Sequence, residues 1–167
     1  MSLLPSPTPN YTLVRPQVPV PSGFLPVKVA QFHETCWATN DTLPNHWAIF
    51  VPTSPIPGIG NYYERVGSSP VYLSQSTFRY HHAWAEQQRG SHTVGFIPAR
   101  LMPNLERRLS LVSAEGMRGC WGSQQWVWEA LQVLQTNRDI FMTQTLTQAE
   151  LCLQMKFVES AWAAGGA

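Results

Sequence analysis

Apolar and polar residues alternate along the chain in two periods, one typical of strands and the other of helices. The runs at 27–32, 45–51, 62–66, 71–73, 78–80 and 92–97 are rich in β-branched and aromatic residues and end in Gly, Pro or polar turns, so they predict strands. Run 45–51 is almost wholly apolar after its first residues, which indicates a strand covered on both faces. A turn rich in Pro and Gly separates this run from 62–66, so the two are expected to form a hairpin.

Three later stretches show helical spacing. The first covers 101–112 and carries Pro103 in its first turn, where proline is favoured. The second begins at Ser123, a good N-cap, and continues to about Gln135, with one continuous apolar face. The third opens on a capping box formed by Thr147 and Glu150. The apolar residues on these three faces are, in chain order, Leu101, Leu105, Leu109, Val112, Trp126, Val127, Ala130, Leu131, Leu134, Leu151, Met155, Val158 and Trp162.

The order of these elements predicts an α+β fold in which an antiparallel sheet of about five strands packs on two or three helices. Residues 27–167 are long enough for one domain with its own core. Residues 1–26 hold seven of the 14 prolines and are predicted to be an extended arm. Because the arm also carries apolar residues such as Val14, Val18 and Phe24, we expect it to pack on its own domain or on a second copy in a homodimer.

The composition narrows the choice of partners and compartment. Lys and Arg total 11 against 10 Asp and Glu, without a basic stripe, so no nucleic-acid partner is predicted. Only 13% of residues are charged and seven are Trp, which favours an apolar small-molecule substrate or a self-association face. No apolar run approaches the length of a membrane span, and early prolines interrupt any signal peptide. Three widely spaced cysteines, Cys36, Cys120 and Cys152, suit free thiols in the cytoplasm.

A nucleophile and a base can be assigned from the residue types. Ser123 and Cys120 lie at or just before a predicted helix N-terminus, where free N–H groups and the helix dipole stabilise an oxyanion or a thiolate. His46 begins the strongest strand and is the candidate base, while Glu64 on the paired strand would orient its ring and Arg65 would face the other way. We therefore expect the His46 and Ser123 side chains to meet directly or through one water. Each residue also has an ordinary structural role, as a helix cap, a packed thiol or a solvated strand side chain.

Other site types fit the sequence poorly. His81, His82, His92 and Cys120 match no ligand spacing of a metal site, and the adjacent histidines would point to opposite faces of a strand. Gly58-Ile59-Gly60 lacks the third glycine and the following helix of a phosphate-binding loop. No Gly-x-Ser-x-Gly motif is present. We therefore predict neither a metal nor another cofactor.

Three segments together resemble a known family. Asn45-His46-Trp47-Ala48-Ile49-Phe50-Val51, the 60–67 strand and Ser123-Gln124-Gln125-Trp126-Val127 are similar to a fungal group of papain-like-fold proteins of the permuted NlpC/P60 superfamily, as in lecithin–retinol acyltransferase-like proteins. That family carries a His-Trp-aliphatic strand first and an Asn-Cys-Gln-x-Trp-Val segment with the nucleophile on a later helix. The resemblance spans about residues 45–135. It implies a papain-like fold and, by analogy, a role in fungal specialised metabolism.

The chain departs from the family at the reactive position. Gly122 and Ser123 stand where the family has Asn and Cys, and the second family histidine has no counterpart. A serine hydroxyl has a far higher pKa than a thiol, so it implies a weak hydrolase, a substrate-trapping variant or a pseudoenzyme that only binds. Cys120, three residues earlier, is an alternative nucleophile.

Two functions are expected from these observations. The first is acyl transfer or hydrolysis at an amide, ester or thioester of an apolar small molecule, with His46, Ser123 and Glu64 as the catalytic residues. The residues beside these positions, Trp47, Cys120, Gln124 and Trp126, are predicted to bind the substrate. The alternative is a non-catalytic binding or assembly module on the same fold.

Overall fold

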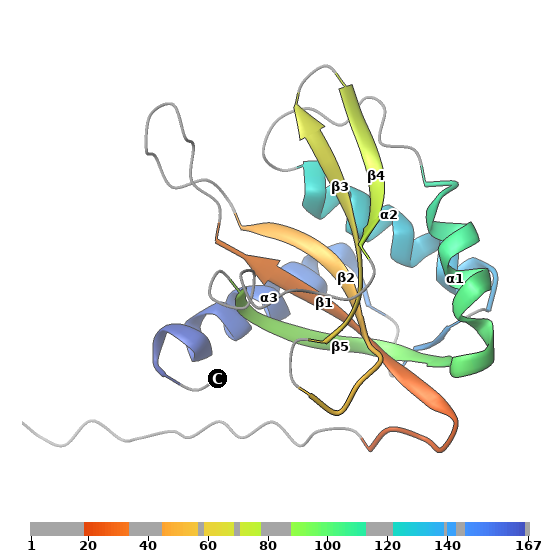
Figure 1. Ribbon diagram of the computed structural model, residues 1–167. Coiled ribbons are helices and arrows are strands. Elements are labelled where there is room, and N and C mark those ends of the chain that lie inside the picture. Colours follow the sequence, from red (N-terminus) through yellow and green to blue (C-terminus); the bar gives the residue numbers. More distant parts are fainter. Residues whose placement is uncertain are drawn as a thin grey trace, which may run out of the picture.

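The structure is a computed structural model, which describes residues 19–33, 45–56, 59–68, 71–77, 88–112, 122–138, 140–142 and 146–165. Its centre is an antiparallel sheet of six strands in the order β4-β3-β2-β1-β5-β6 (Figure 1). The strands are β1 (Phe24–Phe32), β2 (His46–Pro52), β3 (Gly60–Ser68), β4 (Val71–Thr77), β5 (Gln88–Pro98) and the two-residue β6 (Phe141–Met142).

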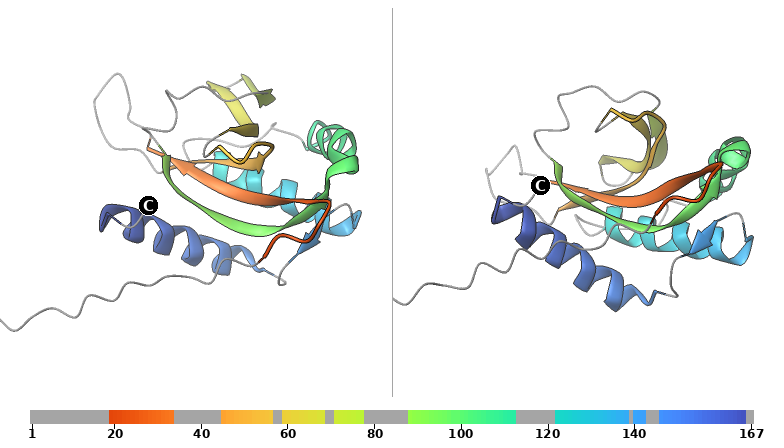
Figure 2. Two further views of the ribbon diagram at one scale, coloured as in Figure 1. Left: turned by 60° about the horizontal axis from the view of Figure 1, so that its bottom comes forward. Right: turned by 90° about the horizontal axis from the view of Figure 1, so that it is seen from below.

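In the described residues three α-helices accompany this sheet: α1 (Met102–Leu109), α2 (Gly122–Thr136) and α3 (Gln148–Ala163). A 3-10 turn, η1 (Ala99–Leu101), precedes α1. Figure 2 shows α2 and α3 under one face of the sheet and α1 at one end of it. The β3–β4 hairpin rises from the opposite face. The predicted α+β class, with an antiparallel sheet and three helices, is confirmed.

Strand alternation divides the buried residues between the two faces of the sheet. On β2, Trp47, Ile49 and Val51 belong to the main core with the apolar face of α2, whereas Ala48 and Phe50 belong to a second cluster. The remaining members of this second cluster are Ala30, Phe32 and Tyr62. The prediction that β2 is covered on both faces is confirmed, because residues 47–51 are all buried.

The first strand differs from the prediction at its start. β1 begins at Phe24, three residues before the predicted start at 27, and it is a central strand that contains Pro26. The proline is tolerated because β2 pairs with β1 only as far as Lys28↔Phe50, so β5 is the one neighbour at Pro26. The pairing of β1 with β5 shifts its register just after this segment, between Val27 and Lys28.

Most other predicted elements are confirmed, with changed ends. β4 and β5 are both longer than predicted, and β5 begins at Gln88, four residues before the predicted start at 92. α2 begins at Gly122, so Ser123 lies in the first helical turn and is not its N-cap. The strand predicted at 78–80 and residues 1–18 of the arm lie outside the described residues. Among the described helices, none combines the length and the apolar character needed to cross a bilayer.

Candidate active site

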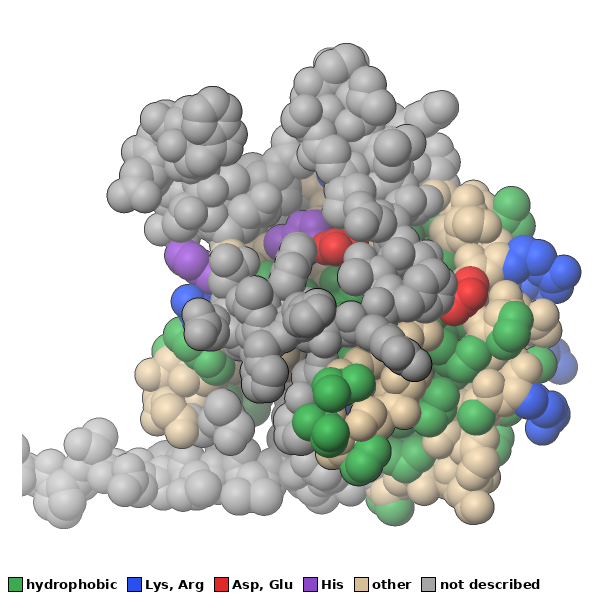
Figure 3. All heavy atoms as spheres, viewed as in Figure 1, with side chains coloured by type: hydrophobic (Ala, Val, Ile, Leu, Met, Phe, Trp, Pro, Cys, Tyr) green, Lys and Arg blue, Asp and Glu red, His purple; other side chains and the backbone are tan. Residues whose placement is uncertain are grey.

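His46 and Glu64 form a close pair on the face of the sheet that α2 and α3 leave uncovered. His46 shares its face of β2 with Ala48 and Phe50, and Glu64 shares its face of β3 with Tyr62. The two strands are hydrogen-bonded, and His46 Nε2 lies 2.7 Å from Glu64 Oε2. Both side chains are largely buried, with 16% and 7% of their surface exposed. Figure 3 shows histidine and acidic side chains adjacent on this face.

The contact fixes which ring nitrogen carries a proton. An ionised carboxylate only accepts hydrogen bonds, so in the neutral ring Nε2 is the donor and Nδ1 keeps the lone pair. Nδ1 is therefore the basic atom of the pair.

Aromatic rings adjoin the pair. The Phe32 ring centroid lies 6.5 Å from that of His46 and 5.8 Å from that of Tyr62, which stacks on Phe50 at 4.3 Å. Burial raises the pKa of Tyr62, and the charge of Glu64 raises it further, so its phenol stays neutral beside the carboxylate. The rings that adjoin the pair are thus neutral and buried.

The N-terminus of α2 lies beside the start of β2, where β3 no longer pairs with that strand. Pairing between the two strands ends at Ile49↔Tyr63, and the backbone groups at the start of β2 bond instead to α2. Trp47 N donates to Ser123 Oγ at 3.2 Å, and Gln124 Nε2 donates to Asn45 O at 3.0 Å. The first turn of α2 therefore replaces β3 as the partner of the residues on either side of His46.

These contacts bring Ser123 next to His46. Standard peptide dimensions place Ser123 Oγ about 4 Å from Cα of His46, because the Trp47 N–H that it accepts lies on the same side of the peptide as that Cα. No direct hydrogen bond joins the imidazole and the hydroxyl in the described part of the chain. The predicted meeting of the two side chains stays a prediction, since the imidazole bonds to Glu64 and the hydroxyl to Trp47 N.

Arg65 faces away from Glu64, as strand alternation predicts. Its side chain is buried, and its guanidinium occupies the space into which a Cβ at Gly122 would project. A larger residue at this position would have to displace the guanidinium. The positive guanidinium and the N-terminal N–H groups of α2 together make this region attractive to negative charge.

The predicted substrate-binding residues are divided by the structure. Trp47 and Trp126 are buried in the main core, 4% and 1% exposed, because one is on the helix side of β2 and the other on the sheet side of α2. This differs from the prediction that they bind substrate. Gln124 ties α2 to Asn45, and Cys120 lies outside the described residues.

Sequence reasoning missed the part that Asn45 has in the site. Its carbonyl oxygen accepts from Gln124 on α2, and its Nδ2 donates to Glu159 Oε1 on α3 at 2.8 Å. Asn45 thereby links both helices to the strand immediately before His46. Its place beside the candidate base was the available signal.

The described residues hold no group of three or more His, Cys, Asp or Glu side chains that could bind a metal ion. Of the histidines and cysteine considered for zinc, His92 lies on β5, and His81, His82 and Cys120 fall outside the described residues. Comparisons with protein-family models, curated proteins and solved structures found no match to this chain.

Proposed function

We propose that this protein is a hydrolase or acyltransferase acting on an amide, ester or thioester of an apolar small molecule. The observation that carries the proposal is the largely buried His46–Glu64 pair beside the first turn of α2. A histidine oriented by a carboxylate next to a hydroxyl at a helix N-terminus has the parts that acyl transfer requires. The resemblance to permuted NlpC/P60 proteins favours the same reaction.

Each residue has a defined role in this reaction. Ser123 Oγ attacks the carbonyl carbon of the substrate, and its proton moves to Nδ1 of His46. Glu64 holds the ring through Nε2 and stabilises the imidazolium. The N–H groups of the first turn of α2 stabilise the oxyanion. The proton then passes from Nδ1 to the leaving group, and water or a second acceptor releases the acyl group from Ser123.

A specific observation favours the alternative of a binding module without catalysis. Ser123 is only 4% exposed, and its oxygen already accepts the Trp47 N–H. In the enzyme, the hydroxyl must turn from this backbone donor toward Nδ1 before it attacks. In a binding module, the same bond would simply join α2 to β2.

The decisive experiment measures the reactivity of a thiol at position 123. We expect Ser123→Cys to react with iodoacetamide at neutral pH roughly tenfold faster than the same variant with His46→Ala, because His46 and the helix N-terminus stabilise the thiolate. Peptide mass spectrometry reports alkylation at position 123, with the native thiol of Cys152 on α3 as an internal reference.

Two further variants sharpen the result. Glu64→Gln in the Ser123→Cys background should lower the labelling rate, because the amide stabilises the imidazolium less than the carboxylate does. His92→Ala on β5 is the matched control and should leave that rate unchanged. Equal labelling with and without His46 would contradict the enzyme and favour the binding module.

A further inference from the structure

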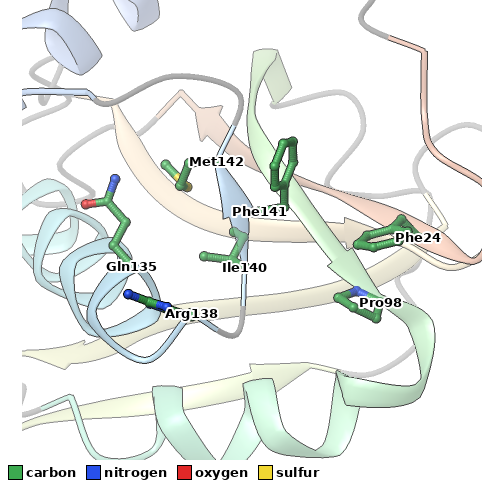
Figure 4. A pocket seen from close by; sticks show the side chains of 7 residues that line it. All are labelled: Phe24, Pro98, Gln135, Arg138, Ile140, Phe141 and Met142. Carbon is green, nitrogen blue, oxygen red and sulfur yellow. The ribbon is translucent and has the colours of Figure 1, made fainter.

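A cavity lies at the end of the sheet opposite the His46–Glu64 pair. It has a volume of about 410 Å³, within the range of small-molecule sites. Its walls come from the start of β1, the end of β5, the C-terminal turn of α2 and β6 (Figure 4). Phe24 at this end of β1 is eight residues from Phe32, which pairs with His46, so the two sites are roughly 26 Å apart along the strand.

Most of the residues that line the cavity are apolar, and one of them, Phe141, is exposed to solvent. The apolar residues are Phe24, Pro98, Ile140, Phe141 and Met142. Phe141 is 63% exposed although it is on a strand. Large apolar side chains left in water next to a cavity are typical of a binding surface. These walls suit the apolar body of a small ligand.

Arg138 gives the cavity a positive charge and has an unusual backbone. Its φ of 51° makes it the one non-glycine residue with a left-handed conformation in the described part of the chain. Arg138 lies just after the end of α2, at a position where proteins commonly have glycine. Its backbone N–H donates to Gln135 O at 3.2 Å. Its guanidinium has no ion-pair partner among the described residues. Glycine adopts this backbone conformation with less strain than arginine does. The presence of arginine at position 138 therefore points to a role for its side chain.

Arg138 and Gln135 both line the cavity and supply donors without an acidic group beside them among its described walls. Figure 4 shows these two residues with Ile140 and Met142 on one side of the cavity and Phe24 and Pro98 on the other. An arginine binds a carboxylate with two parallel hydrogen bonds, and the Gln135 amide can donate another. The chemistry of the walls thus specifies an anionic head and an apolar body.

We propose that this cavity is a binding site for a small monocarboxylate with an apolar body, held at its head by Arg138. The site is independent of the proposed reaction at His46, because it lies at the other end of the sheet and shares no residue with it.

The test measures octanoate binding to the full chain by titration calorimetry, with 1-octanol as the uncharged ligand of equal chain length. We expect octanoate to bind and 1-octanol to bind at least tenfold more weakly, since the alcohol cannot form the charged pair. Arg138→Gly should weaken octanoate binding at least tenfold. The same variant should melt at an unchanged or higher temperature, because glycine adopts the left-handed conformation without strain.

Two more variants complete the design. Arg138→Asn tolerates the same backbone but lacks the charge, so it should lose affinity like Arg138→Gly. Arg107→Gln, at an exposed arginine on α1, should retain wild-type affinity. The proposal is overturned if the wild type does not bind octanoate at millimolar concentration, if 1-octanol binds equally well, or if both Arg138 variants keep their affinity.

Discussion

Lys28 lies on the same face of the sheet as the His46–Glu64 pair, opposite Phe50 on β2. Burial lowers its pKa, because the low-dielectric surroundings disfavour the ammonium. The unfolded chain then binds more protons than the folded chain between the lowered pKa and the ordinary one. The free energy of unfolding therefore rises with pH across that interval, and the charge of Lys28 is a cost to the fold at neutral pH.

Lys28→Met should accordingly stabilise the protein at pH 7, by less than about 1 kcal/mol, because the side chain is only partly buried. Its apolar stem is retained while the charge is removed. The gain should shrink at pH 10, where Lys28 of the folded wild type loses its proton. Urea unfolding at both pH values measures the difference, with Lys156→Met at an exposed position of α3 as the control. A gain that is the same at both pH values would show that charge burial is not its cause.

For individual residues, the sequence predicted the contact between His46 and Glu64 but not the environment of the tryptophans. A two-residue period and a hairpin are enough to place His46, Glu64 and Arg65 on their faces. The same alternation puts Trp47 on the face opposite His46, in the main core. The prediction that Trp47 binds substrate rested on its place next to His46 in the sequence. Adjacent residues on a strand point to opposite faces of the sheet, so this proximity was not a reliable guide.

Among the elements, α3 begins with the clearest local signal in the chain. Thr147 Oγ1 accepts from Glu150 N at 3.2 Å, and Glu150 Oε2 accepts from Thr147 N at 2.7 Å, so the predicted capping box is confirmed. The backbone hydrogen bond from Thr147 lowers the pKa of Glu150. This contribution to stability is present above the ordinary pKa of a glutamate and is lost as the pH falls through the lowered pKa.

Thr147→Ala should lower the free energy of unfolding by about 1 kcal/mol and the melting temperature by roughly 2–4 °C, as the loss of an N-cap does. Glu150→Gln should destabilise the protein at pH 7, and the difference from wild type should diminish as Glu150 becomes protonated in acid. Thermal unfolding followed by circular dichroism tests both variants. Thr53→Ala, at an exposed loop position, should change neither temperature nor pH dependence. An unchanged melting temperature for Thr147→Ala would mean that α3 owes its start to packing alone.

The elements that the sequence predicted well are those with a strong period or cap. The apolar face of α2 is buried at every predicted position, and β2 spans nearly the predicted residues. β6 has only two residues and no period to detect. The start of β1 was not predicted because Pro26 argues against a central strand. Only the strand pairing shows that β2 has no partner residue opposite Pro26.

For the whole molecule, the arrangement depends on contacts between segments far apart in the chain. β1 pairs along its length with β5, and their partners differ by up to 74 residues in number, as in Phe24↔Pro98. Periodicity predicts that such strands exist but not which of them are neighbours. The sequence likewise did not predict how α3 packs on the sheet. One buried side chain on β1 contributes to this packing.

Gln31 is that residue, 2% exposed and pointing toward α3. Its Nε2 donates to Met155 O on α3 at 3.0 Å and to Arg89 O on β5 at 3.1 Å. A glutamine amide has two N–H groups, and both are used here. Because these bonds join β1 to segments 58 and 124 residues away, Gln31 connects three elements at a single point in the core.

Gln31→Met keeps most of the side-chain volume but removes both donors, so two carbonyl groups lose partners in the core. We expect the free energy of unfolding to fall by roughly 2–3 kcal/mol, because two hydrogen bonds of the buried amide are lost together. The melting temperature should fall by about 4–10 °C. Hydrogen exchange should increase most in α3 and β5, the two elements that the side chain holds. Gln132→Met, at an exposed position of α2, is the matched control. Equal melting temperatures for the two variants would show that apolar packing of Leu151 and Met155 is sufficient to hold α3 on the sheet.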